Sequence, residues 1–381
     1  MINREEVIQM AWECGFEDIG FASAEPFADQ KARLETMSEE YAWAAASGVH
    51  LETGTDPASI LPGAKSIIVL MEVYFREAYP HVLEKHFGRC YLDDDRVTKD
   101  GLALRVKKFR SFLRDSGIDS KVPFNLPHRV AAARAGLGDF GKNCLFYSKK
   151  AARKSSWVLP ITVVTDHPFV PDEPSGGIGC PEWCRNACIA ACPTRALKGN
   201  RTIDPRLCIS YMTYYGNEIT PRELREPMGL YVYGCDRCQD ICPRNAAWLA
   251  EKLPMNKRVV AKEDDLDLEK LLLMDKDYFL ANVWPHMFYM GPDKIWKWKM
   301  NVARVMGNSK NAEYLPVLQQ AFSENDDPRI RGMIAWSVGR LGGRDAKQML
   351  DDFKGLTADS DELVLEEIEA ALELQLTSCM I

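Results

Sequence analysis

The alternation of apolar and polar positions divides the first half of the chain into helical and extended stretches. Residues 4–13 and 102–117 place apolar side chains at helical spacing. Two apolar runs rich in β-branched residues, at 65–75 and 157–166, predict buried strands. The pattern therefore predicts an α/β domain that extends to about residue 172, where a segment rich in proline and glycine follows.

The last third of the chain, residues 248–381, has helical patterns throughout. It contains a weak repeat, because residues 301–322 resemble residues 333–353. The matched positions are 32 residues apart: Ala303 and Ala335, Gly307 and Gly339, Leu318 and Leu350. Paired helices at such a spacing are typical of a helical solenoid, although two amphipathic helices can also match by coincidence. A membrane span needs about 18 consecutive apolar residues, and no apolar run in the chain is nearly that long, so we expect no membrane contact.

Residues 173–247, between these two regions, hold eight of the twelve cysteines. A segment this short and loop-rich needs metal or another staple to hold a fold. Its first run has cysteines at equal steps of four and then Pro193, and its last run ends at Pro243. In chain order the cysteines are Cys180, Cys184, Cys188, Cys192, Cys208, Cys235, Cys238 and Cys242.

Eight thiolates are the number that two [4Fe–4S] clusters require. In two-cluster ferredoxins the cysteine that precedes the proline binds the other cluster. That rule groups Cys180, Cys184, Cys188 and Cys242 around a first cluster, and Cys192, Cys208, Cys235 and Cys238 around a second. Two alternatives stay open: a structural zinc site, and a helix that carries unbound thiols on one face.

The charge of the chain is unevenly distributed. The net charge of the chain is −7. Residues 355–381 alone account for it, because they contain seven acidic residues and no Lys or Arg. Residues 96–154 hold 15 Lys and Arg against four Asp and Glu, which indicates either a solvated helical face or a surface for an anionic partner. "KIWKWK" (294–299) interleaves basic and aromatic residues, as nucleic-acid surfaces do. The same pattern also fits a helix whose lysines extend past buried tryptophans.

"GLGDFG" (136–141) matches G-x-G-x-x-G, but a helical run precedes it, so it fails as a dinucleotide fingerprint. The stretch "ARAGLGDFGKNCL", followed by "ITVVTD", "CPTRAL", "CISYMTY" and "YGCDRCQDICPRN", instead resembles the epoxyqueuosine reductase family. The resemblance extends from "GFEDIGFA" near the start to "DPRIRGMIAWSVGRLG" at 327–342.

This resemblance implies an α+β multidomain fold: a cobalamin-binding α/β domain at 1–172, a ferredoxin-like domain with two [4Fe–4S] clusters at 173–247, and α-helical HEAT-like repeats at 248–381. It implies a cytoplasmic oxidoreductase that receives electrons from a donor such as ferredoxin or flavodoxin. The cobalamin is expected base-off, because no D-x-H-x-x-G motif offers a histidine ligand. The residues assigned to the cobalamin are Gly136, Gly138, Gly141, Lys142, Asn143 and Tyr211.

The chain departs from the family pattern at the position of the proposed proton donor. Val122 stands where the family has an aspartate, His128 replaces a glutamate, and residues 88–97 run differently. The remaining candidates for a catalytic proton donor are Tyr74, Tyr147, Lys142 and His128.

Three functions follow from this combination. The missing aspartate favours a cobalamin-dependent reductase that acts on an epoxide or carbon–halogen bond of a small molecule, and this is the function the sequence predicts. The basic segments favour the first alternative, reduction of epoxyqueuosine in tRNA. The second alternative is an electron carrier or reductive activator of a corrinoid protein.

Overall fold

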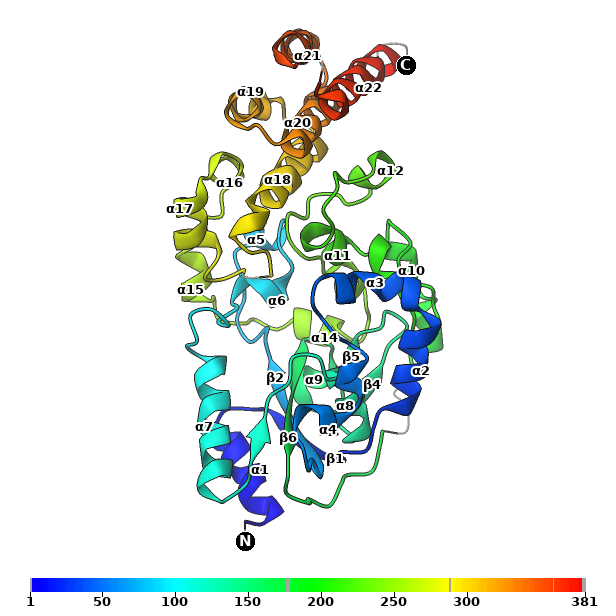
Figure 1. Ribbon diagram of the computed structural model, residues 1–381, viewed down its shortest axis with the longest axis vertical. Coiled ribbons are helices and arrows are strands. Elements are labelled where there is room, and N and C mark those ends of the chain that lie inside the picture. Colours follow the sequence, from blue (N-terminus) through cyan, green and yellow to red (C-terminus); the bar gives the residue numbers. More distant parts are fainter. Residues whose placement is uncertain (1, 176–178, 288, 359, 379–381) are drawn as a thin grey trace. The chain divides into compact units, whose positions relative to one another are not determined.

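The computed structural model describes residues 2–175, 179–287, 289–358 and 360–378 (Figure 1). The chain forms two compact units, and each draws on separate stretches of sequence. Unit 1 comprises residues 1–78, 99–208 and 236–254, and unit 2 comprises residues 79–98, 209–235 and 255–381. The domain boundaries at residues 172 and 247 stay a prediction. Within the described residues, no helix has the length and apolar character needed to cross a membrane.

Unit 1 is built on a four-stranded antiparallel sheet in the order β1-β2-β6-β3. The strands are β1 (Asp18–Ser23), β2 (Ser66–Val73), β3 (Ser120–Lys121) and β6 (Val158–Thr165). The two runs predicted as buried strands are the two central ones, and Val69 of β2 pairs with both Gly20 and Thr162. All eight residues of β2 are buried, which explains why its sequence is apolar without alternation.

Both helices predicted in this part of the chain are present, as α1 (Arg4–Glu13) and α7 (Leu102–Asp115). Their apolar faces, which include Val7 and Phe109, join Phe21, Ile68 and Val163 of the sheet in one core. The other helices of unit 1 are α2 (Ala28–Thr36), α3 (Ser38–Ala46), α4 (Pro57–Ile60), α8 (His128–Arg134), α9 (Ala151–Lys154), α10 (Ala187–Ala191), α13 (Arg237–Asp240) and α14 (Ala246–Leu249).

A short β-hairpin follows α8 and carries the "GLGDFGKN" stretch. Strands β4 (Gly138–Phe140) and β5 (Phe146–Ser148) pair antiparallel, and Asp139 lies opposite Tyr147. The turn between them therefore presents Lys142 and Asn143 at the tip of the hairpin.

Unit 2 contains the C-terminal helices together with residues 79–98 and 209–235. Its long helices are α18 (Ile295–Ser309), α19 (Leu315–Glu324), α20 (Pro328–Leu341), α21 (Arg344–Leu356) and α22 (Glu362–Ser378). The shorter ones are α5 (His81–Glu84), α6 (Arg89–Leu92), α11 (Ile209–Tyr214), α12 (Arg222–Arg225), α15 (Lys257–Val260), α16 (Leu268–Leu273) and α17 (Lys276–Tyr278). The two sequence repeats are thus the helix pairs α18–α19 and α20–α21 (Figure 1).

The repeated glycines lie at close contacts between successive helices. A Cβ on Gly307 of α18 would lie 2.8 Å from the Cα of Ser337 in α20. A Cβ on Gly339 of α20 would lie 2.7 Å from the Cβ of Ala371 in α22. Glycine therefore allows the same close helix contact at equivalent positions of the two repeats, as expected for a solenoid of stacked repeats.

We expect Gly339→Ala to lower the free energy of unfolding by about 1–3 kcal/mol, because the added methyl group overpacks the contact between α20 and α22. Gly355→Ala in α21 is the matched control, since nothing lies within 4 Å of a Cβ there. That control should instead be neutral or stabilising by about 0.5–1 kcal/mol. Anaerobic urea unfolding measures both variants, and equal effects of the two would contradict the packing argument.

Candidate functional site

The first cysteine run does not form a single helix. Cys184 ends a 3₁₀ turn (Glu182–Cys184), and Cys188 lies in the separate helix α10. Between them Arg185 and Asn186 adopt left-handed conformations, with φ of 47° and 60°. The interpretation of equally spaced cysteines as a thiol stripe on one continuous helix is therefore wrong.

The thiols of Cys180, Cys184, Cys188 and Cys242 lie close enough together to interact electrostatically. Burial, together with smaller contributions from Cys242, Cys180 and Cys184, raises the pKa of the Cys188 thiol to about 11. A group of neighbouring thiols is suited to cationic metal, which binds their thiolate forms and offsets the repulsion between the negative charges. These four residues are the set that the sequence groups around one [4Fe–4S] cluster, and the donor chemistry fits such a cluster.

No three Cys, His, Asp or Glu side chains among the described residues are grouped as ligands of a single metal ion. In a [4Fe–4S] cluster each thiolate binds a different iron, so a cluster site is wider than a single-ion site.

The β4–β5 hairpin supplies hydrogen-bond donors to these cysteines. The backbone N–H of Lys142 donates to Cys180 Sγ at 3.3 Å, and the hydroxyl of Tyr147 donates to Cys242 Sγ at 3.0 Å. Asn143 Nδ2 donates to the Tyr147 hydroxyl oxygen at 2.9 Å and to the carbonyl of Cys238 at 3.1 Å. The "GKN" turn therefore lies directly against the cysteine-rich segment.

Burial and the neighbouring sulfur of Cys242 raise the pKa of Tyr147, so its hydroxyl keeps its proton and acts as a donor. The guanidinium of Arg244 lies 4.1 Å from the centre of the Tyr147 ring and packs on its face. Arg244 thus covers one face of the ring, and the hydroxyl donates to the sulfur of Cys242.

The three glycines of this stretch are required by the packing of the protein itself. A Cβ on Gly138 would lie 2.1 Å from the carbonyl oxygen of Tyr147, and one on Gly141 would lie 2.6 Å from the Tyr147 ring. Gly136 has a φ of +71°, and a Cβ there would lie 2.5 Å from the carbonyl oxygen of Glu173. The fold therefore accounts for these glycines without a cofactor, and their contact with cobalamin stays a prediction.

Tyr74 belongs to a polar network that braces α13, which carries Cys238. Its hydroxyl donates to Gln239 Oε1 at 3.2 Å, and Ser156 Oγ donates to the same oxygen at 2.9 Å. Asn245 Nδ2 donates to the backbone carbonyl of Gln239 at 2.9 Å. Sequence reasoning missed Gln239, Asn245 and Ser156; the only available signal was that the first two lie in "CDRCQDICPRN".

His128, the fourth candidate donor, begins α8 and makes a hydrogen bond between its Nδ1 and Thr162 Oγ1 at 2.9 Å. Burial lowers its pKa to about 4, so the imidazole is neutral near pH 7 and carries no acidic proton to give. Val122 lies in the loop before α8 with 39% of its surface exposed, and Phe124 in the same loop is 66% exposed.

The residues assigned to the second cluster are distributed between the two units. Cys192 follows α10 with its sulfur 3.7 Å from Thr194 Oγ1, and Cys208 follows a 3₁₀ turn (Pro205–Leu207). Cys238 is in α13, whereas Cys235 ends a segment of unit 2. Tyr211, assigned to the cobalamin, is also in unit 2, where its ring stacks on Tyr215 with centroids 5.3 Å apart.

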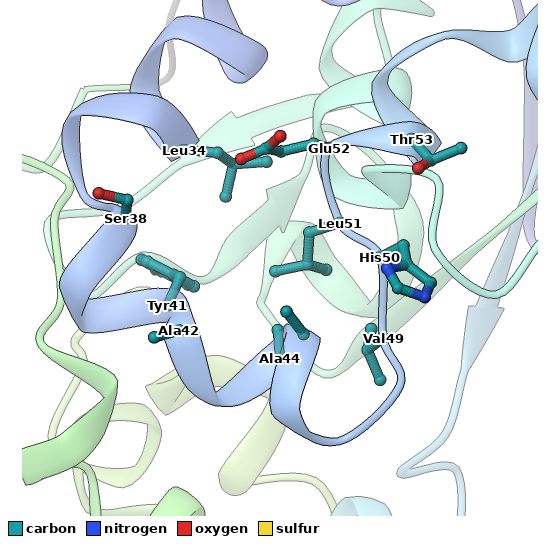
Figure 2. Close-up of a pocket in the computed structure, with 11 residues that line it drawn as sticks. Leu34, Ser38, Tyr41, Ala42, Ala44, Val49, His50, Leu51, Glu52 and Thr53 are labelled. Carbon is teal, nitrogen blue, oxygen red and sulfur yellow. The ribbon is translucent and has the colours of Figure 1, made fainter.

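A hollow of about 230 Å³ lies elsewhere in unit 1, between α2, α3 and residues 49–53 (Figure 2). None of the residues predicted for catalysis, for the clusters or for cobalamin lines it. Its polar lining includes Ser38, Tyr41, His50, Glu52 and Thr53.

Comparison with known families identifies the class of protein. A model of the 4Fe-4S double cluster binding domain matches residues 180–245, and a model of HEAT repeats matches residues 293–373. The chain is an iron–sulfur protein with C-terminal HEAT repeats, as the cysteine pattern and the helical repeat predict. The first match favours iron–sulfur clusters over the zinc alternative.

Comparison with individual proteins identifies the family. A protein from Bacillus cereus named epoxyqueuosine reductase is 30% identical over 97% of this chain and 97% of its own length. A relative of the same name from Listeria monocytogenes is 29% identical over 96% of each chain. The chain therefore belongs to the epoxyqueuosine reductase family and is an oxidoreductase.

Solved structures agree with this assignment. Epoxyqueuosine reductase from Bacillus subtilis, with an aspartate-bearing catalytic loop swung out of its active site, matches with a TM-score of 0.80 at 27% identity. That match covers 97% of this chain and 98% of the other. A structure of epoxyqueuosine reductase with an epoxyqueuosine-modified tRNA-Tyr stem loop also has a TM-score of 0.80, at 27% identity over 98% of each chain. The predicted fold class is confirmed.

We expect Tyr147→Phe to lower the reduction potential of the first cluster. A hydrogen bond to a cluster sulfur stabilises the more negative reduced state, so its loss makes reduction harder. The expected shift is on the order of 40 mV, which corresponds to about 1 kcal/mol for one electron. Redox titration monitored by electron paramagnetic resonance measures it.

Tyr278→Phe is the matched control, because that hydroxyl donates to the backbone carbonyl of Asp265 at 2.9 Å and to no cluster cysteine. A potential that stays unchanged in Tyr147→Phe would show that the hydroxyl does not bond to a cluster ligand in the loaded protein.

Proposed function

We propose that this protein reduces the epoxide of epoxyqueuosine carried by tRNA. The observation that supports this most strongly is the similarity over nearly the whole chain to proteins named epoxyqueuosine reductase. The structural neighbour that holds a modified tRNA stem loop is similar over 98% of the chain, HEAT repeats included. The excess of Lys and Arg in residues 96–154 is suited to a phosphate backbone.

This proposal replaces the small-molecule substrate that the sequence favoured. That preference rested on Val122 alone, whereas the similarity to the family involves every part of the chain. The electron-carrier alternative has no comparable support, because the relatives are named as reductases.

In our proposal, electrons pass through two [4Fe–4S] clusters. Cys180, Cys184, Cys188 and Cys242 hold the first, and Cys192, Cys208, Cys235 and Cys238 hold the second. The mutual interaction of the first four thiols and their hydrogen bonds from the hairpin support the first group. An external one-electron donor such as ferredoxin or flavodoxin supplies the electrons, in a cytoplasmic setting.

The cofactor that we propose to receive these electrons is cobalamin, base-off and without a histidine ligand. It supplies a reduced cobalt centre that can cleave a carbon–oxygen bond. The residues that would hold it are the hairpin glycines with Lys142 and Asn143, together with Tyr211. The hairpin turn touches Cys180 and Cys238, so an electron acceptor bound at this turn would lie beside the cluster ligands.

Opening an epoxide requires a proton for its oxygen, and Val122 has none to give. The hydroxyls of Tyr147 and Tyr74 donate to Cys242 and to Gln239, and His128 is neutral near pH 7. Lys142 carries an ammonium group whose Nζ lies 2.6 Å from Asn186 Oδ1 at the exposed side of the hairpin. We propose Lys142 as the proton donor.

The function is tested with tRNA that contains epoxyqueuosine. Anaerobic protein loaded with cobalamin and a chemical reductant should convert the modified nucleoside, and mass spectrometry of the digested tRNA follows its loss. Omission of cobalamin should abolish conversion. Complete inactivity on tRNA, together with turnover of a small epoxide or organohalide, would reinstate the small-molecule function.

Lys142→Met should lower turnover by about 10²–10⁴-fold, the usual cost of losing a general acid. Cluster content should stay at about eight iron atoms per chain, because the contact with Cys180 comes from the backbone N–H, which the substitution keeps. Lys149→Met, an exposed lysine after β5, is the matched control and should retain activity. Turnover within twofold of the unmodified protein would exclude Lys142 as the donor.

A further inference from the structure

Helix α18 carries a stripe of polar side chains through an otherwise apolar, buried surface. The stripe consists of Lys297, Asn301, Arg304 and Asn308, at spacings of four, three and four residues. Such spacing places side chains on one face of a helix. Asn301 and Arg304 have no exposed surface, and Lys297 is 3% exposed. "KIWKWK", which indicates a nucleic-acid surface by its composition, therefore contributes a buried cation.

All four side chains of this polar stripe donate to backbone carbonyls of one segment, residues 209–235. Lys297 donates to the carbonyl of Gly216 at 3.2 Å, and Asn301 donates to those of Thr213 at 2.7 Å and Val232 at 3.1 Å. Arg304 donates to the carbonyls of Gly229 at 2.8 Å and of Tyr231. Asn308 donates to those of Arg225 at 2.8 Å and Gly229 at 2.9 Å. Carbonyls that lack partners at the ends of α11 and α12 and in the loops after them are thus satisfied by side chains of α18.

This segment begins directly after Cys208 and ends at Cys235, two cysteines assigned to the second cluster. Its two ends are also joined, because Gly234 N–H donates to Thr213 Oγ1 at 3.0 Å. Tyr231, which accepts from Arg304, is four residues from Cys235, so the Cα atoms of the two lie within about 14 Å.

The charges of the polar stripe have no anionic partner among the described residues. Burial alone lowers the pKa of Arg304 to about 9, without a contribution from any carboxylate. Burial also lowers the pKa of Lys297 to about 7, and the charged groups that face it, Lys294 and Arg329, are cations too. Burying uncompensated cations is costly, which indicates that an anion completes this part of the protein. A [4Fe–4S] cluster with four thiolates is such an anion, and it becomes more negative on reduction.

We propose that the polar stripe of α18 positions the segment that ends at Cys235 and that its buried cations raise the reduction potential of the second cluster. Lys297 and Arg304 are positioning residues that act through the backbone and through their charge. This inference rests on the cysteine set that we propose for the second cluster.

The test compares cluster potentials in charge-changing variants. Redox titration at pH 6 with electron paramagnetic resonance resolves the two clusters, and Cys208→Ser identifies which signal belongs to the second. In Arg304→Gln the potential of the second cluster should become more negative while that of the first stays unchanged. Arg304→Lys keeps the charge and should restore most of the difference.

Lys297→Met is the independent variant, and it decides the outcome if Arg304→Gln does not fold. It should shift the second cluster in the same direction. Lys299→Met on the same helix is its matched control, because Lys299 donates to Asn325 Oδ1 at 3.1 Å and not to the segment after Cys208. Unchanged potentials, or equal shifts of both clusters, in variants that hold about eight iron atoms would overturn the inference.

Failure of the proposed cysteine set is a different result and is seen without any α18 variant. The unmodified protein would then contain about four iron atoms per chain, and the inference would fall with the second cluster.

Discussion

The constraint on which unit 1 depends is the gathering of thiol groups that repel one another once they lose their protons. Burial and, to a smaller extent, three neighbouring cysteines raise the pKa of the Cys188 thiol. Near pH 7 the raised pKa keeps the Cys188 thiol protonated and uncharged, whereas a cationic metal would replace the proton and bind the thiolate. The surrounding structure is consistent with an anionic occupant: the Lys142 N–H and the Tyr147 hydroxyl both donate toward sulfur.

The same contacts explain why the "GLGDFGKN" stretch has its composition. The hairpin must approach the cysteine-rich segment closely, so Gly138 and Gly141 leave room for the Tyr147 backbone and ring. Tyr147 in turn is fixed by Asn143 and by the Arg244 face contact. The hairpin therefore joins Lys142, which we propose as the proton donor, to cysteines that we propose as cluster ligands. In unit 2, α18 braces the segment before Cys235 in a comparable way, although with side chains that bind carbonyls.

The strands, helices and repeats of this protein could be predicted from local sequence patterns and from residue spacing. Apolar runs gave β2 and β6, helical periodicity gave α1 and α7, and a 32-residue repeat gave the helix pairs of the solenoid. The presence of two clusters was predicted from the number of cysteines, whereas their grouping by the rule about the cysteine before proline stays a prediction. What could not be predicted depends on contacts between distant residues. Ser156 joins Gln239 across 83 residues, and Arg304 reaches Tyr231 across 73. Neither pair leaves a signal in a single sequence.

The choice of substrate shows how one position can mislead a sequence argument. Val122 removes a proton donor, which bears on one step of a reaction, whereas substrate recognition depends on a surface built by many residues. A proton can come from any acidic group that reaches the reacting oxygen, so a donor can move from one loop to another at small structural cost. The fold cannot be replaced so easily, because the similarity to the family extends through the HEAT repeats as well as the cysteine-rich segment. Similarity along 97% of the chain therefore bears on the substrate more strongly than the loss of one carboxylate does. Val122 and the neutral His128 beside Thr162 have no acidic proton to offer, so a donor on another element is needed, and Lys142 at the hairpin tip is the residue that we propose for that role.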